Sequence, residues 1–254
     1  MIADPAKATT GSNDQCQPGT ARYLPGKLRG EVWLTVQTRI AQGFIFGRAA
    51  TVDKPSILGL LGFADRLRVI WNAAGTDDPY ADWWLIKVDK ALEHARDRIY
   101  SEQAALAAIM QKQSALQIQV AESEQPYRIA LQFANPYAFW GAQLIGEFDG
   151  VARTVLTARY VGLLNSTAAH EYLQMCSGPI RTLFAVTQGY RALAINRDSM
   201  NGDGKAVRDA VDVMGVLPPS VLSGDRKPSL TPYRAGQATP LAASLTDIKE
   251  ADRS

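Results

Sequence analysis

The sequence predicts an α+β fold that is predominantly helical, with a few short strands and flexible termini. Apolar residues recur every three or four positions through most of the middle of the chain, as on the buried face of a helix. Asp or Asn followed by Pro opens several of these stretches. By contrast, only a few short stretches alternate with the period of a strand.

The domain limits follow from composition. With 254 residues, 46% of them hydrophobic, the chain is long enough to bury a sizeable core. Residues 1–27 are rich in small, polar and turn-forming types, which predicts a disordered leader. Residues 218–254 contain several prolines among scattered charges, which predicts a disordered tail. We therefore expect a single mostly helical domain over residues 28–217.

The first half of this domain is expected to hold one strand and two helices. Residues 31–38 alternate between apolar and polar positions, which is typical of a strand. The run Asp53-Lys54-Pro55 is a helix start signal, and apolar residues follow at helical spacing as far as Ile70. The run Asp77-Asp78-Pro79 repeats the signal before a long helix that continues to about Met110.

The second half is expected to hold two strands and three helices. Residues 116–120 and 127–133 both alternate, so each predicts a strand. The helices are expected from Asn135-Pro136 to Gly162, onward from Asn165, and from about residue 203 to residue 214. Gly178-Pro179 predicts a kink or a break inside the second of these helices.

Charge and cysteine content indicate in which cellular compartment the protein lies and which partners it can bind. The 27 Lys and Arg residues against 25 Asp and Glu residues give a net charge of +2, so attraction to nucleic acid must come from a local basic face. Cys16 and Cys176 do not form the pattern of a disulfide framework, and no apolar run is long enough to cross a bilayer. We therefore expect a cytoplasmic protein that does not associate with membranes.

The sequence contains no recognisable catalytic or metal-binding pattern. His94 and His170 each lack a second ligand at helical spacing, and neither cysteine has a convincing histidine partner. The loop at residues 201–205 resembles a calcium or phosphate loop only in part, because its oxygen ligands and glycines stand at the wrong offsets. The sequence therefore predicts no enzyme activity, no metal ion and no cofactor.

The element order over residues 127–190 is strand, helix, turn and helix, as in a ribbon-helix-helix DNA-binding unit. In such a unit, two chains pair their strands into an antiparallel ribbon that enters the major groove. One side of the strand packs on the helices, while Arg128, Ala130 and Gln132 lie on the other. These side chains suit guanine, the thymine methyl group and adenine, respectively. This mechanism predicts a homodimer that binds double-stranded DNA.

Further residues are candidates for contacts with phosphate. The helix start at Asn165, Ser166 and Thr167 offers hydroxyl groups and backbone amides. Arg153 and Arg159 add positive charge nearby in the sequence. We expect these five residues to lie near the DNA backbone.

Other interpretations of the same patterns remain open. An alternating strand before a capped helix is common in ordinary mixed folds, and a lone Arg or Gln on a strand is usually only solvated. Arg66 and Arg68 either contact phosphate or pair with acidic neighbours. The alternative function is a non-enzymatic helical adaptor that binds another protein through the helix at residues 82–110 or through the proline-containing tail.

Several runs of sequence carry a resemblance to a known family. They are Arg29 to Arg39, Asp53-Lys54-Pro55 with Leu58 to Ala64, Asp78 to Leu85, Leu131 to Ala138, and Arg153 to Arg159. Together they resemble a family carried by integrating conjugative elements, whose relatives include AcaB-like transcriptional regulators. The resemblance implies a DNA-binding transcriptional regulator of conjugative transfer genes, with other element-encoded proteins as further partners. The alternative within the same family is an accessory protein of the conjugation machinery.

Overall fold

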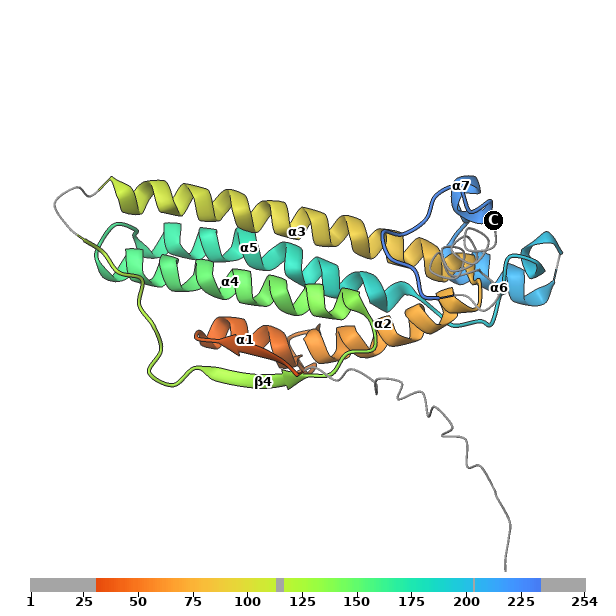
Figure 1. Ribbon diagram of the computed structural model, residues 1–254, viewed down its shortest axis with the longest axis horizontal. Coiled ribbons are helices and arrows are strands. Elements are labelled where there is room, and N and C mark those ends of the chain that lie inside the picture. Colours follow the sequence, from red (N-terminus) through yellow and green to blue (C-terminus); the bar gives the residue numbers. More distant parts are fainter. Residues whose placement is uncertain (1–30, 113–116, 203, 234–254) are drawn as a thin grey trace, which may run out of the picture. The chain divides into compact units, whose positions relative to one another are not determined.

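The structure is a computed structural model that describes residues 31–112, 117–202 and 204–233 (Figure 1). The expected leader and the last part of the expected tail lie outside these residues. The helices are α1 (Arg39–Phe46), α2 (Leu60–Gly75), α3 (Pro79–Gln111), α4 (Pro136–Tyr160), α5 (Ser166–Val186), α6 (Lys205–Met214) and α7 (Pro219–Leu222), and the strands are β1 (Val32–Val36), β2 (Gly47–Arg48), β3 (Ile57–Leu58) and β4 (Tyr127–Leu131). The predicted class, predominantly helical with a few short strands, is confirmed.

The three longest helices begin where the capping signals place them. Asp78 accepts hydrogen bonds of 2.8 and 3.2 Å from the backbone amides of Tyr80 and Ala81 at the start of α3. Asn135 and Asn165 accept one bond each from the first turns of α4 and α5. In each case a side-chain oxygen satisfies an amide that has no partner within its own helix.

The core lies between packed helices. Helices α3, α4 and α5 lie side by side, and α1 and α2 contact α4 (Figure 1). Phe63 of α2 and Phe184 of α5 meet with ring centroids 4.7 Å apart. Other large side chains that are fully buried include Leu67, Leu85, Ile99 and Phe148. In the part of the chain that the structure describes, no helix combines the length and the apolar character needed to cross a membrane.

The strands expected at residues 31–38 and 127–133 are present as β1 and β4. They pair with each other in an antiparallel two-stranded sheet, in which Val32 lies opposite Leu131 and Val36 opposite Tyr127. In the ribbon-helix-helix unit expected at residues 127–190, this strand would pair with its copy in a second chain, whereas here its partner is β1 of the same chain. We call this pair the β1–β4 ribbon.

Three local predictions differ from the structure. Helix α2 begins at Leu60 and not after Asp53, because residues 51–54 form a turn closed by backbone hydrogen bonds of 2.9 and 3.3 Å. Residues 117–120 lie in no strand, since no backbone–backbone hydrogen bond joins them to another described segment. Helix α5 continues through Pro179 without a break.

Residues 218–233, the first part of the expected tail, include α7 and pack against the helices. Val221 of α7 is fully buried. The backbone amide of Leu230 donates a hydrogen bond of 3.1 Å to the hydroxyl of Tyr137 on α4. Burial of apolar side chains and these backbone contacts offset the entropy lost on ordering the segment.

Candidate nucleic-acid interface

The outward side of the β1–β4 ribbon combines side chains from both strands. The inward side packs against the helices through Leu34, Val36, Ile129 and Leu131. Because side chains alternate along a strand, Trp33 and Thr35 of β1 and Arg128 and Ala130 of β4 are exposed on the other side. Thr35 lies opposite Arg128, and Trp33 lies opposite Ala130. The ribbon therefore presents a continuous surface of mixed chemistry to solvent.

Arg128 lies over the ring of Trp33 on the neighbouring strand. The guanidinium carbon is 5.3 Å from the ring centroid, within the range of a cation–π contact. The Trp33 side chain remains 49% exposed, and its indole N–H donates to Glu31 Oε2 at 3.2 Å. The ring restricts the rotamers of an exposed arginine, which reduces the entropy that Arg128 would lose on binding a ligand.

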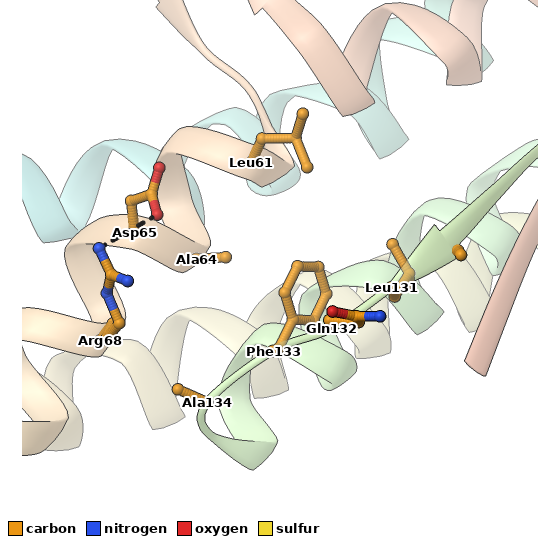
Figure 2. Close-up of a pocket in the computed structure, with 9 residues that line it drawn as sticks. Leu61, Ala64, Asp65, Arg68, Leu131, Gln132, Phe133 and Ala134 are labelled. Carbon is orange, nitrogen blue, oxygen red and sulfur yellow. Dashed lines mark ion pairs between the residues drawn. The ribbon is translucent and has the colours of Figure 1, made fainter. Parts of the chain in front are cut away.

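Gln132 follows β4 directly and is exposed at the end of the ribbon. It lines a groove of about 390 Å³ between α2 and residues 130–134. Figure 2 shows Gln132 and Phe133 on one wall of this groove, and Arg68 and Asp65 on the α2 wall. Arg68 and Asp65 form an ion pair of 3.8 Å, with side chains 61% and 76% exposed. Such an exposed pair is weak, so Arg68 is available for another anion.

The other candidates for phosphate contacts lie mainly at the far end of α4. Arg159 is exposed in its last turn, and Ser166 and Thr167 are exposed in the first turn of α5. Asn165 caps α5 with a hydrogen bond of 2.8 Å. Because α4 has 25 residues, its ends are roughly 37 Å apart at 1.5 Å per residue. The structure does not bring these residues together with Gln132.

Arg153 has its charge satisfied within the protein. Its Nε donates to the Ala121 carbonyl at 2.9 Å, and its terminal nitrogen donates to Glu122 Oε1 at 3.0 Å. The side chain is 20% exposed. Arg153 therefore holds the segment that leads into β4, and a phosphate would have to compete with Glu122 for it.

The contribution of β1 to this surface does not follow from the sequence. Alternation over residues 31–38 put Trp33 and Thr35 on one side of a strand, but a period of two does not identify the neighbouring strand. The usable signal was that both stretches alternate between apolar and polar positions. Paired in register, they place both polar sides together.

A second polar cluster lies at the start of α3. Arg197 forms ion pairs with Asp77 and with Asp82, the latter at 2.7 Å with the carboxylate side chain only 1% exposed. These contacts fasten the chain after α5 to α3. Within residues 31–112, 117–202 and 204–233, no group of His, Cys, Asp or Glu side chains could hold a metal ion. We therefore assign this cluster a structural role.

Comparison with known proteins identifies the family. Residues 24–234 match the family described as "Transcriptional regulator AcaB". The crystal structure of selenomethionine-containing AcaB from uropathogenic E. coli resembles this fold with a TM-score of 0.52 and 15% sequence identity, over 77% of this chain and 95% of that chain. No curated protein matches the chain. Because the family match extends over most of the sequence, the chain belongs to the AcaB family of transcriptional regulators, a class that is generally non-enzymatic.

Proposed function

We propose that this AcaB-family protein is a DNA-binding regulator of the conjugative transfer genes of an integrating conjugative element. It contacts double-stranded DNA with the outward side of the β1–β4 ribbon. The observation that carries the proposal is the antiparallel pairing of these strands, which exposes Arg128 and Ala130 next to Thr35 and Trp33. Family membership supports the regulatory role.

The ribbon has suitable dimensions and chemistry for the major groove. A groove about 12 Å wide admits two strands. Arg128 can donate two hydrogen bonds to guanine, Gln132 can bond adenine at both of its edge positions, and Ala130 can contact a thymine methyl group. Thr35 adds a hydroxyl that accepts or donates. These side chains lie on one face in two adjacent strands, so they can contact neighbouring base pairs.

This proposal modifies the ribbon-helix-helix unit expected at residues 127–190. If two copies paired their β4 strands, the resulting four strands at about 4.8 Å spacing would span roughly 14 Å between the outer backbones, too wide for the groove. One copy therefore inserts one ribbon of its own. A homodimer would then place two ribbons in two half-sites about 34 Å apart.

Backbone contacts complete the proposed interface. Arg159 and the start of α5, with Ser166 and Thr167, offer charge and amides to a phosphate some distance from the inserted ribbon. Asn165 contributes through its cap, which fixes the geometry of that helix start. Arg153 acts indirectly, because it positions the segment before β4. Such contacts raise affinity for all sequences equally.

The test is fluorescence anisotropy of the full chain on DNA from upstream of the transfer genes, against scrambled DNA, over a salt series. The double variant Arg128→Ala with Gln132→Ala is expected to lose about tenfold or more of the preference for the upstream DNA, since each good base contact contributes about 1–3 kcal/mol of discrimination. Arg226→Ala is the charge-matched control, because Arg226 is exposed and lies next to α7. This control should keep the preference.

Two outcomes would count against the proposal. If the wild type binds neither DNA above background at low salt, DNA binding is rejected. The alternative, a non-enzymatic adaptor of the conjugation machinery, then takes its place. If the double variant keeps the full preference, sequence is recognised by another surface.

A further inference from the structure

Residues 117–121 have the pattern of a strand but no strand partner. Ile118 and Val120 are half-buried, whereas Gln117 and Gln119 between them are exposed. No backbone–backbone hydrogen bond involves residues 117–120 among the described parts of the chain. The sequence thus favours a strand that this chain does not complete by itself, and it leaves a row of unpaired backbone groups.

An apolar groove lies beside this segment. It has a volume of about 570 Å³ and runs between the segment and the end of α4. On the α4 side, Leu156, Tyr160 and Val161 are 39%, 91% and 41% exposed. None of the side chains that line the groove is charged. Large apolar side chains gathered beside an open backbone edge are typical of an interaction surface.

Two hydrogen bonds of Ala121 hold the end of this segment against α4. Ala121 directs its N–H to the Thr157 hydroxyl at 3.0 Å and its carbonyl to Arg153 at 2.9 Å, both on α4. In an extended chain, N–H and C=O groups two residues apart point to the same side. Gln117 and Gln119 line the same groove as Ala121. As part of a strand, they would direct their backbone groups into this groove, as Ala121 directs its own toward α4.

We infer that this edge pairs antiparallel with the same segment of a second copy of the chain. With Ile118 opposite its own counterpart, Gln117 lies opposite Gln119 of the other copy, and apolar residues stay on one side. Each copy then places its segment in the groove of the other, as a two-fold symmetric interface requires. This inference names the surface of the homodimer in the proposed function, and it does not depend on DNA contact.

Charge favours a second copy as the occupant. Residues 117–121 contain no charged side chain, and neither does the lining of the groove. A second copy of this segment can therefore enter the groove without burying a charge. Lys112 precedes the segment and Glu124 follows it, while Glu122 is already paired with Arg153. Antiparallel pairing therefore brings the basic end of one copy toward the acidic end of the other, while parallel pairing would bring like charges together.

Sedimentation velocity of the full chain over a concentration series tests the inference. The wild type should dimerise, and Gln119→Pro should weaken dimerisation about tenfold or more, because proline removes one ladder hydrogen bond from each copy. Gln119→Ala is the matched control. It removes the same side chain but keeps the amide, so it should dimerise like the wild type.

Hydrogen exchange of the wild type gives a second, independent measurement. The amides of Gln117 and Gln119 should become protected as protein concentration rises, and this result stands even if the proline variant does not fold. A wild type that stays monomeric at every concentration overturns the inference, as does a dimer that Gln119→Pro leaves unchanged. A dimer that forms as expected but binds no DNA would reject the proposed function and leave this interface standing.

Discussion

The hydroxyl of Tyr190 donates a hydrogen bond of 2.6 Å to Asp78 Oδ2 inside the protein. The other oxygen of Asp78 caps α3 through the backbone amides of Tyr80 and Ala81. One buried carboxylate thus joins the start of α3 to the chain that follows α5. Burial raises the pKa of Asp78, and burial together with the neighbouring carboxylate raises the pKa of Tyr190.

Tyr190→Phe should lower the free energy of unfolding by about 1–3 kcal/mol, because Asp78 Oδ2 is left buried without its donor. Urea unfolding followed by circular dichroism measures the change. Tyr172→Phe is the control, since Tyr172 is half-buried and no hydrogen bond of its hydroxyl is found among the described residues. The two variants losing equal stability would show that the Tyr190 hydroxyl makes no special contribution.

The raised pKa of Asp78 also predicts a pH dependence. The folded protein holds this proton more tightly than the unfolded chain, whose Asp has a pKa of 3.8. The stabilising contribution is therefore complete below 3.8 and is lost as pH rises through the higher pKa of the folded state. Measured against Asp78→Asn, which does not titrate, the unfolding free energy of the wild type should fall with pH in this acidic window. A constant difference between the two proteins would contradict the shift.

Gly47→Ala should destabilise the protein by about 3 kcal/mol or more. Gly47 has a φ of +71°, and an added Cβ would lie 2.2 Å from the Ile57 carbonyl oxygen. Gly43→Ala, within α1, meets nothing within 4 Å and should instead stabilise by up to about 1 kcal/mol. Thermal unfolding of both variants tests this pair, and similar melting temperatures would refute the close contact between β2 and β3.

Arg68 and Asp65 should affect DNA binding in opposite directions. Their groove adjoins the β1–β4 ribbon (Figure 2), so the DNA backbone would pass beside them. Arg68→Ala should weaken binding to every sequence and lower the slope of log affinity against log salt by about 0.9. Asp65→Asn should strengthen binding. Arg66→Ala is the control, because Arg66 is exposed but does not line the groove.

Cys176 should react slowly with thiol reagents in the folded protein. It is fully buried, and burial raises the pKa of its thiol to about 11, so little thiolate is present near neutral pH. In a Cys16→Ala background, reaction with a chromogenic disulfide should become fast only after the addition of denaturant. The pKa shift also predicts that this residue's contribution to stability is lost as pH rises from 9 toward about 11. A fast native reaction at Cys176, located by mass spectrometry, would show that the site opens locally.

Local signals predicted the starts of α3, α4 and α5 because capping is local chemistry, whereas α1 was not predicted. Asn135 lies immediately before the helix that it caps, and its side chain bonds an amide three residues further on. The same logic failed at Asp53, which instead lies in the turn at residues 51–54, immediately before Pro55. The Asp-Pro pattern suits both structures, and only the packing of Leu60 and Phe63 in the core shows where α2 begins.

Long-range contacts could not be predicted from the sequence. The exposure of Arg128, Ala130 and Gln132 followed from alternation and agrees with the structure, although their contact with DNA remains a prediction. Their neighbours Trp33 and Thr35 did not follow, because the choice of a strand partner depends on how the helices bring distant segments together. The packing of residues 218–233 was not predicted either, since proline content says nothing about a surface to pack on.

The contact between Leu230 and Tyr137 can form only late in synthesis, after Leu230 has been added to the chain. The two residues are 93 positions apart, and this length takes roughly 5–20 s to synthesise at about 5–20 residues per second. During that interval α4 can pack against the other helices while the Tyr137 hydroxyl still lacks its hydrogen bonds to Leu230. A chain released before Leu230 would lack these bonds and be less stable, so chaperones and proteases would treat such a truncated product differently from the finished protein.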